Sequence, residues 1–419
     1  MLDPHTFWAE PYLACPRCGR ESFGEPHFTV GVKECWACRY KEVIKLPALR
    51  KRVIYLHQGA MSDMMEALNP KNEAHERARA HPLWPALYER LDRLTQLQLA
   101  ICPMSEEHRR ESLVSPFPED LDKITDQLSQ GISFNSFNQI WAGQVFTAAK
   151  AWVQNAPPTF DFDPAGITSK DLHAWSPRLR LTVRMNLAAF ADRTRRQRDA
   201  AYAMFTPVYE SRQQDPRSFD ELLEIEGSRY GPALLRIEQG ARQRQAEMWA
   251  RALAGEPDTT EPEDWMTPPA VSVVEGLREL FVENNLPPDD SLTGFFQSRL
   301  FRAIPQHQID ARIWAAIGAQ LGRGQRAIPN QGAGVDVFTI STLFPYCDAI
   351  FVDNGARAWL EQVPQGRRFP CTTQVFSANT GVEFLKYLTA IEDSAPAEHV
   401  QMVRQVYGED WPRPFNPFT

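Results

Sequence analysis

The sequence lacks several features that would point to a membrane or to polyanions. It contains no run of about 18 apolar residues, the minimum for a membrane-spanning helix. Residues 1–5 lack the charged start and apolar core of a signal peptide. The 45 lysines and arginines stand against 53 acids, so the net charge of −8 does not favour nucleic acid or membranes. We therefore expect a cytoplasmic protein without membrane contact, on which any basic surface is local.

The chain also lacks a disulfide framework and a phosphate-binding P-loop. Only seven of its 419 residues are cysteines, and four of these form two CxxC pairs. In a cytosolic chain this usage favours a metal site and free thiols over disulfides. The glycines within residues 321–334 follow no predicted strand and precede no Lys-Ser/Thr pair, which excludes a P-loop. With 43% hydrophobic and 23% charged residues, the composition is that of a globular protein of two or three domains.

The two CxxC pairs predict a structural zinc site. Sixteen residues separate Cys18 from Cys35, which fits the spacing of a zinc ribbon. Two thiolates on each tight turn reach one ion, and Gly19 suits the left-handed conformation of such a turn. Four thiolates leave no open coordination position. A redox CxxC is the alternative, but two pairs at this distance argue against it. The predicted ligands are Cys15, Cys18, Cys35 and Cys38.

The partner of the ribbon stays open between RNA, DNA and protein. Its basic residues would form one positive face: Arg17, Arg20, Lys33, Arg39 and Lys41. Trp36, Phe23 and Phe28 could stack on bases. Alternatively these rings are the small core of the ribbon, the interpretation that we favour for Phe23 and Phe28.

Two apolar runs, residues 53–56 and 349–352, predict neighbouring strands of a parallel sheet covered on both faces. The first run is followed by His57 and the second by Asp353. Because ligands of open α/β sheets collect at the carboxyl edge, we expect both side chains to meet there. Asp336, at the start of a predicted helix, would join them. Asp348 suits a cap or turn before the second strand, and the alternative is that it supports a metal site without binding the ion itself.

The segments between these strands are predominantly helical. Ser105 predicts a helix start, with His108 and Glu111 in the following turns. His108 is more typical of a satisfied helix histidine. Glu111 could pair with Arg109 or a lysine, or face the sheet edge. Residues 178–198 are the most basic stretch. They are either a solvated helix surface or a phosphate-contacting arm, for which the candidates are Arg193, Arg195, Arg196 and Arg198.

These pieces resemble PIN-like nucleases of the VapC type, in particular a group with an N-terminal zinc ribbon. The resemblance rests on residues 53–62, 101–113 and 336–354, about half of the chain with the intervening segments. It implies an α/β fold with a parallel sheet flanked by helices, and a metal-dependent nuclease, with RNA or another single-stranded nucleic acid as substrate. It further implies Mg²⁺ or Mn²⁺ held by Asp336, Asp353 and Glu111. Because the family is rich in toxins and defence proteins, such a role would follow by analogy.

The sequence departs from that family at the first strand, where the pattern has aspartate and this chain has His57. Met104 likewise stands where an acid is expected. Imidazole is a poor Mg²⁺ ligand. His57 could hold a softer metal, act as a general acid or base, mark a site that has lost the nuclease reaction, or be an ordinary strand-end histidine. The alternative function is a non-catalytic protein that binds nucleic acid or protein through the ribbon and the arginine arm.

The predicted domain organisation has four parts. Residues 1–46 form the zinc ribbon, and residues 47–114 the first part of the PIN-like domain. Residues 115–272 form a large helical insertion, which ends in an acidic, proline-rich stretch at residues 254–270. Residues 273–419 complete the PIN-like domain.

Overall fold

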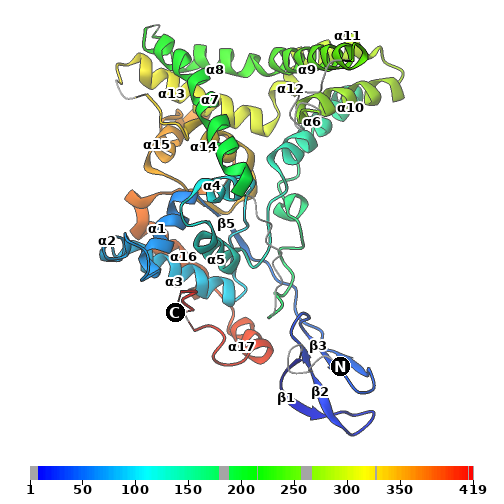
Figure 1. The fold of residues 1–419 in the computed structure, drawn as a ribbon, viewed down its shortest axis with the longest axis vertical. Helices are drawn as coiled ribbons and strands as arrows, with labels where there is room; N and C mark the ends of the chain where they lie inside the picture. The colour runs from blue at the N-terminus through cyan, green and yellow to red at the C-terminus, as the bar shows by residue number, and fades with distance from the viewer. Residues whose placement is uncertain are drawn as a thin grey trace.

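The computed structural model describes residues 8–178, 188–214, 216–255, 267–325, 328–413 and 415–418. Figure 1 shows small antiparallel strands at one end of the molecule, a parallel sheet flanked by helices in the middle, and long helices at the other end. Within the described ranges, no helix is long and apolar enough to cross a membrane.

The N-terminal strands form a four-stranded antiparallel sheet in the order β1-β2-β3-β4. Its buried core consists of Cys15, Phe23 and Cys35. Phe23 therefore lies in the core as expected, whereas Phe28 is 51% exposed and the expectation for it was wrong. So small a core predicts that a metal supplies much of the stability of this sheet. The strands are β1 (Trp8–Ala14), β2 (Glu21–Pro26), β3 (Val32–Cys35) and β4 (Lys41–Val43).

The second sheet has four parallel strands in the order β6-β5-β7-β8. The predicted pairing of two strands almost 300 residues apart is confirmed, since Ile54 pairs with Ala349 and Leu56 with Phe351. The strand predicted over residues 97–102 is shorter, because Gln98 has a positive φ of 57° and turns the chain after α3. The strands are β5 (Arg52–Leu56), β6 (Ala100–Ile101), β7 (Ala349–Phe351) and β8 (Gln374–Phe376).

Both faces of this sheet are covered, as continuous apolar strands require. Ile54 and Leu56 pack into one core and Val53 and Tyr55 into another, because successive strand residues point to opposite faces. The first core is closed by α1 (Gln58–Leu68), α3 (Leu83–Gln96), α5 (Pro118–Ser129) and α16 (Gly381–Asp393). The second is closed by α13 (Pro305–Gly322), α14 (Ala333–Leu343) and α15 (Asn354–Gln362). The α/β class predicted from the sequence is thus confirmed.

A separate aromatic core holds the far helices together around Phe281, Phe295 and Phe301. It is built from α6 (Phe137–Val153), α9 (Tyr230–Leu253), α10 (Pro269–Glu283), α11 (Pro288–Gln297) and α12 (Arg299–Arg302). Helices α7 (Ala188–Gln214) and α8 (Phe219–Ser228) pack against α13, which links this region to the parallel sheet. The remaining α-helices are α2 (His75–Ala80), α4 (Glu106–Val114) and α17 (Ala397–Tyr407).

Candidate functional site

The four cysteines of the two CxxC pairs converge, with all ligand atoms within 4.8 Å of one another. The Sγ atoms of Cys15 and Cys38 are 3.6 Å apart, and those of Cys18 and Cys35 are 3.7 Å apart. Zinc–sulfur bonds of about 2.3 Å place the sulfurs of a tetrahedral site about 3.8 Å apart. The donor set and its spacing therefore fit a structural Zn²⁺ ion.

Both cysteine turns end in a left-handed residue. Gly19 has a φ of 71°, as the sequence predicted, and Arg39 occupies the matching place in the second turn with a φ of 61°. The N–H groups of Gly19 and Arg39 each donate to the carbonyl of the first cysteine of their turn at 2.8 Å. A left-handed conformation costs a non-glycine residue about 1–2 kcal/mol.

Replacing Arg39 with glycine is therefore expected to tighten zinc binding about fivefold, the equivalent of about 1 kcal/mol. The lost ion pair with Glu34 subtracts little, because the Arg39 side chain is 71% exposed. Chelator competition measures the zinc affinity. Gly19→Ala is the matched control and should weaken binding, since its strain is confined to the backbone. Equal affinities in all three proteins would contradict the strain argument.

The predicted basic face of the ribbon is partly neutralised. Arg39 and Lys41 both pair with Glu34 at 3.2 Å. The ring of Trp36 packs against Tyr12, with centroids 4.7 Å apart, and against Trp8 at 5.8 Å. These aromatic rings therefore lie together on the ribbon.

The second candidate site lies at the carboxyl edge of the parallel sheet, between β5 and β7. Strand order reverses there, since β6 lies on one side of β5 and β7 on the other. The His57 N–H donates to the carbonyl of Phe351 at 2.8 Å, so the two strands still run together where they end. His57 is the N-cap of α1, and Asp353 is the N-cap of α15, where it accepts the N–H of Ala356. Because the ends of β5 and β7 are hydrogen-bonded neighbours, the backbone places His57 and Asp353 at the same edge of the sheet.

His57 makes a direct contact with Asp336, with 3.0 Å between Nε2 and Oδ1. The Asp336 side chain is 7% exposed and that of His57 22%. Burial lowers the pKa of His57, but the hydrogen bond and charge of Asp336, with the charges of Glu111 and Asp353, outweigh it and raise this pKa to about 9. The imidazolium therefore supplies the positive charge beside these carboxylates. We call His57, Glu111, Asp336 and Asp353 the edge cluster.

One contact opposes this protonation. The N–H of Gly59 donates to Nδ1 of His57 at 3.1 Å, which requires an unprotonated Nδ1. An N-terminal cap contributes about 1 kcal/mol, less than one pKa unit. The effect of the carboxylates on the pKa of His57 is therefore larger than that of the cap. At neutral pH we expect His57 to be protonated and its hydrogen bond from Gly59 to be lost.

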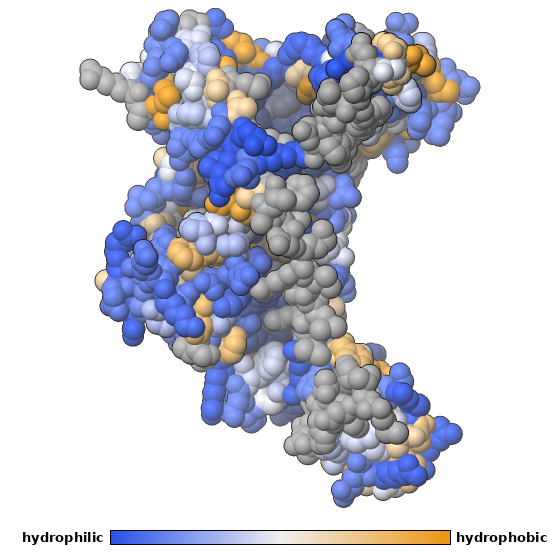
Figure 2. Space-filling model, viewed as in Figure 1, coloured by the Kyte–Doolittle hydropathy of each residue, from blue (hydrophilic) through white to orange (hydrophobic). Residues whose placement is uncertain are grey.

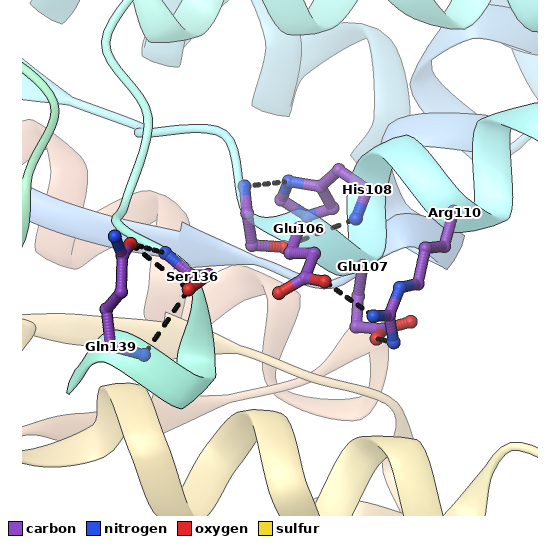
Figure 3. Close-up of polar contacts among 7 residues, drawn as sticks. Glu106, Glu107, His108, Arg110, Ser136 and Gln139 are labelled. Atoms are coloured by element: carbon purple, nitrogen blue, oxygen red, sulfur yellow. Dashed lines mark hydrogen bonds and ion pairs between the residues drawn. The ribbon is translucent and has the colours of Figure 1, made fainter. Parts of the chain in front are cut away.

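Glu111 reaches the same edge from α4. Burial raises the pKa of its carboxyl to about 7, helped by Asp336 and Glu107 and opposed by His57. Figure 3 shows the start of α4, where Arg110 pairs with Glu106 and Glu107 while His108 closes a capping box. No ion pair of Glu111 is found within the described part of the chain.

His108 and Asp348 make structural contacts with strand β5 and are not part of the edge cluster. Nε2 of His108 contacts the carbonyl of Leu56 at 2.6 Å, and Nδ1 accepts the N–H of Ser105. Burial lowers the pKa of His108 to about 4, so its ring is neutral. Asp348 accepts the N–H of Val53 at 2.8 Å and pairs with Arg52 at 2.7 Å. It thus ties β7 to β5, consistent with the predicted cap or turn.

The acids of the edge cluster do not form a ready metal shell. Among the described residues, only the four cysteines bring three or more potential ligand atoms within 4.8 Å of one another. The Asp336 carboxylate is committed to His57, and Asp353 to the α15 N-terminus. In this arrangement the residues do not fit Mg²⁺ or Mn²⁺.

The stretch predicted as an arginine arm is described only in part, because residues 179–187 lie outside the described ranges. Arg195 pairs with Asp192 at 2.6 Å and donates to the carbonyl of Val114. Arg198 lies close enough to Glu111 to lower its pKa. Figure 2 shows a strongly hydrophilic patch over α7, the helix that carries Arg193, Arg195, Arg196 and Arg198.

A cavity of about 770 Å³ adjoins the edge cluster, and Glu111 and Arg198 both line it. We call it the edge cavity. Its walls come from α4, α6, α7, α9, α10, α13 and α14, and several aromatic side chains contribute to the lining. The aromatic lining consists of Trp141, Tyr202, Phe205, Tyr209, Tyr230, Trp314 and Phe338. Sequence reasoning missed these residues, because no local pattern shows that five helices turn them toward one space.

The polar wall of the edge cavity is also preorganised. Arg229 pairs with Asp310 at 3.0 Å and with Glu226 at 2.6 Å, and its guanidinium lies over the rings of Tyr230 and Trp314. The Tyr230 hydroxyl donates to the same Asp310 carboxylate. This network fixes the aromatic side chains in place before any ligand arrives.

The edge cluster predicts a specific dependence of stability on pH. The folded pKa of His57, about 9, exceeds its ordinary value of 6.5. Its stabilising contribution is therefore complete below pH 6.5 and is lost as the pH rises through 9. We expect the free energy of unfolding of the wild-type protein to exceed that of the His57→Asn variant by about 1–3 kcal/mol at pH 6.5. This difference should vanish by about pH 10. Urea unfolding at each pH measures it, and a constant difference would contradict the His57–Asp336 assignment.

No protein-family model, curated protein or solved structure matches this chain.

Proposed function

We propose that this chain binds single-stranded nucleic acid, RNA in the first instance, in the edge cavity of a PIN-like scaffold in which His57 replaces the metal. The observation that carries the proposal is the His57–Asp336 contact at the strand-order reversal, beside a cavity of about 770 Å³. Open α/β sheets bind their ligands at such a reversal. In this proposal the protonated side chain of His57 supplies the positive charge that a metal ion would otherwise supply among Glu111, Asp336 and Asp353.

The lining of the edge cavity suits unpaired bases. Aromatic side chains stack on any base and contribute about 1–3 kcal/mol per base. Tyr202 and Phe205 are half-buried on α7 and line the cavity, where Phe205 stacks on Trp314 with 5.2 Å between the ring centroids. Tyr202 is therefore the side chain that we expect to stack on a base. Duplexes hide their base faces, and the cavity therefore favours single strands.

Phosphate contacts come from few arginines. Arg198 on α7 lines the edge cavity, whereas Arg110, on the neighbouring helix α4, is held by Glu106 and Glu107. With a net charge of −8 the protein as a whole repels polyanions, so we expect modest affinity that falls as salt rises.

Fluorescence anisotropy with a short labelled RNA tests this function. Tyr202→Ala and Arg198→Gln are each expected to weaken binding about tenfold, the loss of one stacking or one charged contact. Arg196→Gln is the matched control, because Arg196 is exposed on the same helix and is absent from the cavity lining. If Arg196→Gln weakens binding as much as Arg198→Gln, the nucleic acid follows the surface of α7 instead.

The metal-dependent nuclease expected from the resemblance is the second candidate. It is favoured by the gathering of Glu111, Asp336 and Asp353 around His57, all of which raise its pKa. In that case Asp336, Asp353 and Glu111 would hold Mg²⁺ or Mn²⁺ only after the His57 side chain moves away from Asp336. Wild-type protein that cuts RNA with either metal, and loses cutting in Asp353→Ala, would establish this function over simple binding.

A further inference from the structure

A second cavity, of about 310 Å³, lies behind the edge cavity. The two share α13 as a wall. Asp310 and Trp314 face the edge cavity, whereas Ile309, Arg312 and Ile313 face the second cavity. Residues three and four apart share one helix face, so α13 presents different faces to the two. A volume of about 300 Å³ is at the lower end for small-molecule sites. We call this cavity the arginine pocket.

The floor of the arginine pocket is apolar. It is formed by side chains from α13, α15, β8 and the turn before β7: Ile309, Ile313, Phe344, Leu360, Val363 and Val375. The Thr373 hydroxyl, the one hydroxyl in the lining, already donates to the carbonyl of Phe344 at 2.6 Å. The floor therefore suits an apolar body and offers little to a sugar.

Two guanidinium groups, of Arg312 and Arg368, also line the pocket. Arg312 donates to the carbonyls of Arg367 at 2.6 Å and Gln308 at 2.8 Å. Arg368 donates to the carbonyls of Val363 at 3.4 Å and Glu361 at 3.3 Å. Carbonyl oxygens position these cations without neutralising them.

No carboxylate balances this charge within the described part of the chain. The ion pairs found there include neither Arg312 nor Arg368, and the one acid in the lining, Glu361, pairs with Arg357 at 2.6 Å. Burial and the nearby charge of Arg367 lower the pKa of Arg312, the direction expected for a cation without a counter-ion. An uncompensated half-buried cation is costly, and an anion would remove that cost.

We propose that the arginine pocket binds a small organic acid whose carboxylate meets Arg312 and Arg368 and whose apolar body covers the floor. Guanidinium groups match the planar carboxylate geometrically, and charged hydrogen bonds of this kind are about twice as strong as neutral ones. The site is separate from the edge cavity and does not depend on the function proposed for it.

Displacement of the fluorescent apolar anion 8-anilinonaphthalene-1-sulfonate tests the proposal. Octanoate is expected to displace the dye at a concentration at least about tenfold lower than 1-octanol, because only octanoate carries the charge. In Arg312→Gln/Arg368→Gln this preference should disappear. Arg323→Gln is the control, since Arg323 follows α13, also donates to a backbone carbonyl, and is absent from the pocket lining. It should leave the preference unchanged.

Two results would overturn the proposal. One is equal displacement by octanol and octanoate in the wild-type protein. The other is an undiminished preference for octanoate in the double variant. If circular dichroism shows that the double variant does not fold, Arg368→Gln alone replaces it, because this side chain is exposed and makes only long contacts to carbonyls. It should reduce the preference at least about threefold, and no reduction would contradict the proposal.

Discussion

Replacing His57 with aspartate is expected to make the stability of this protein respond to divalent metal. The substitution removes the cation that faces Asp336, Glu111 and Asp353 and adds a further carboxylate. Without metal, repulsion among these acids should lower the midpoint of thermal unfolding. Saturating Mn²⁺ should then recover about 2.7 kcal/mol at a concentration one hundred times the dissociation constant. The wild-type protein should show no metal-dependent shift if, as we propose, His57 takes the place of the ion.

His57→Asn is the matched control, since it removes the cation without adding a negative charge. It should be destabilised at neutral pH yet remain indifferent to Mn²⁺. A wild-type protein stabilised by Mn²⁺ as strongly as His57→Asp would contradict the replacement of metal by His57. If His57→Asp also cuts RNA with Mn²⁺, and Asp353→Ala in that background abolishes cutting, the PIN-like lineage is supported directly.

Loss of the predicted zinc ligand Cys35 should unfold the ribbon while the parallel sheet survives. The buried core of the ribbon consists of Cys15, Phe23 and Cys35, so little apolar burial can replace the metal. Structural zinc contributes roughly 10–16 kcal/mol of apparent free energy in small zinc domains. In Cys35→Ser we expect no bound zinc and rapid tryptic cleavage after Lys33, Arg39 and Lys41, whereas the wild-type protein should carry one zinc and resist cleavage there.

Cys102→Ser is the control for that experiment, because Cys102 is a buried free thiol in the core of the parallel sheet. It should retain the zinc and the protected ribbon. Elemental analysis of the purified proteins gives the zinc content. A wild-type protein without zinc, or a Cys35→Ser variant with a protected ribbon, would show that the ribbon folds without the metal.

The sequence predicted the scaffold well because the scaffold depends on local patterns. Four apolar residues before His57 and four before Asp353 indicated two covered parallel strands, and these strands pair in the structure. The spacing of the cysteines likewise indicated a closed metal site, and their sulfurs converge. In both cases the physical requirement is carried by a few neighbouring residues.

The details of the edge could not be read from the sequence. The strand tip carrying Asp353 was identified, but its use as the cap of α15 depends on the path of the next turn. The sequence placed Asp336 near the edge, whereas its contact with His57 depends on how α14 docks. The edge cavity is harder still to predict, because it is assembled from helices as far apart in the chain as α4, which ends at Val114, and α14, which begins at Ala333. Composition and periodicity contain no record of which faces of those helices point to one space.

Crosslinking of a single-stranded RNA that carries 4-thiouridine tests the central proposal most directly, because it maps where the bases lie. With wild-type protein we predict adducts on α7 and α13, which carry Tyr202, Phe205 and Trp314 of the cavity lining. These adducts should decrease in Tyr202→Ala while the protein remains folded. Adducts confined to the ribbon, or equal labelling of α7 and α13 in both proteins, would contradict binding in the edge cavity.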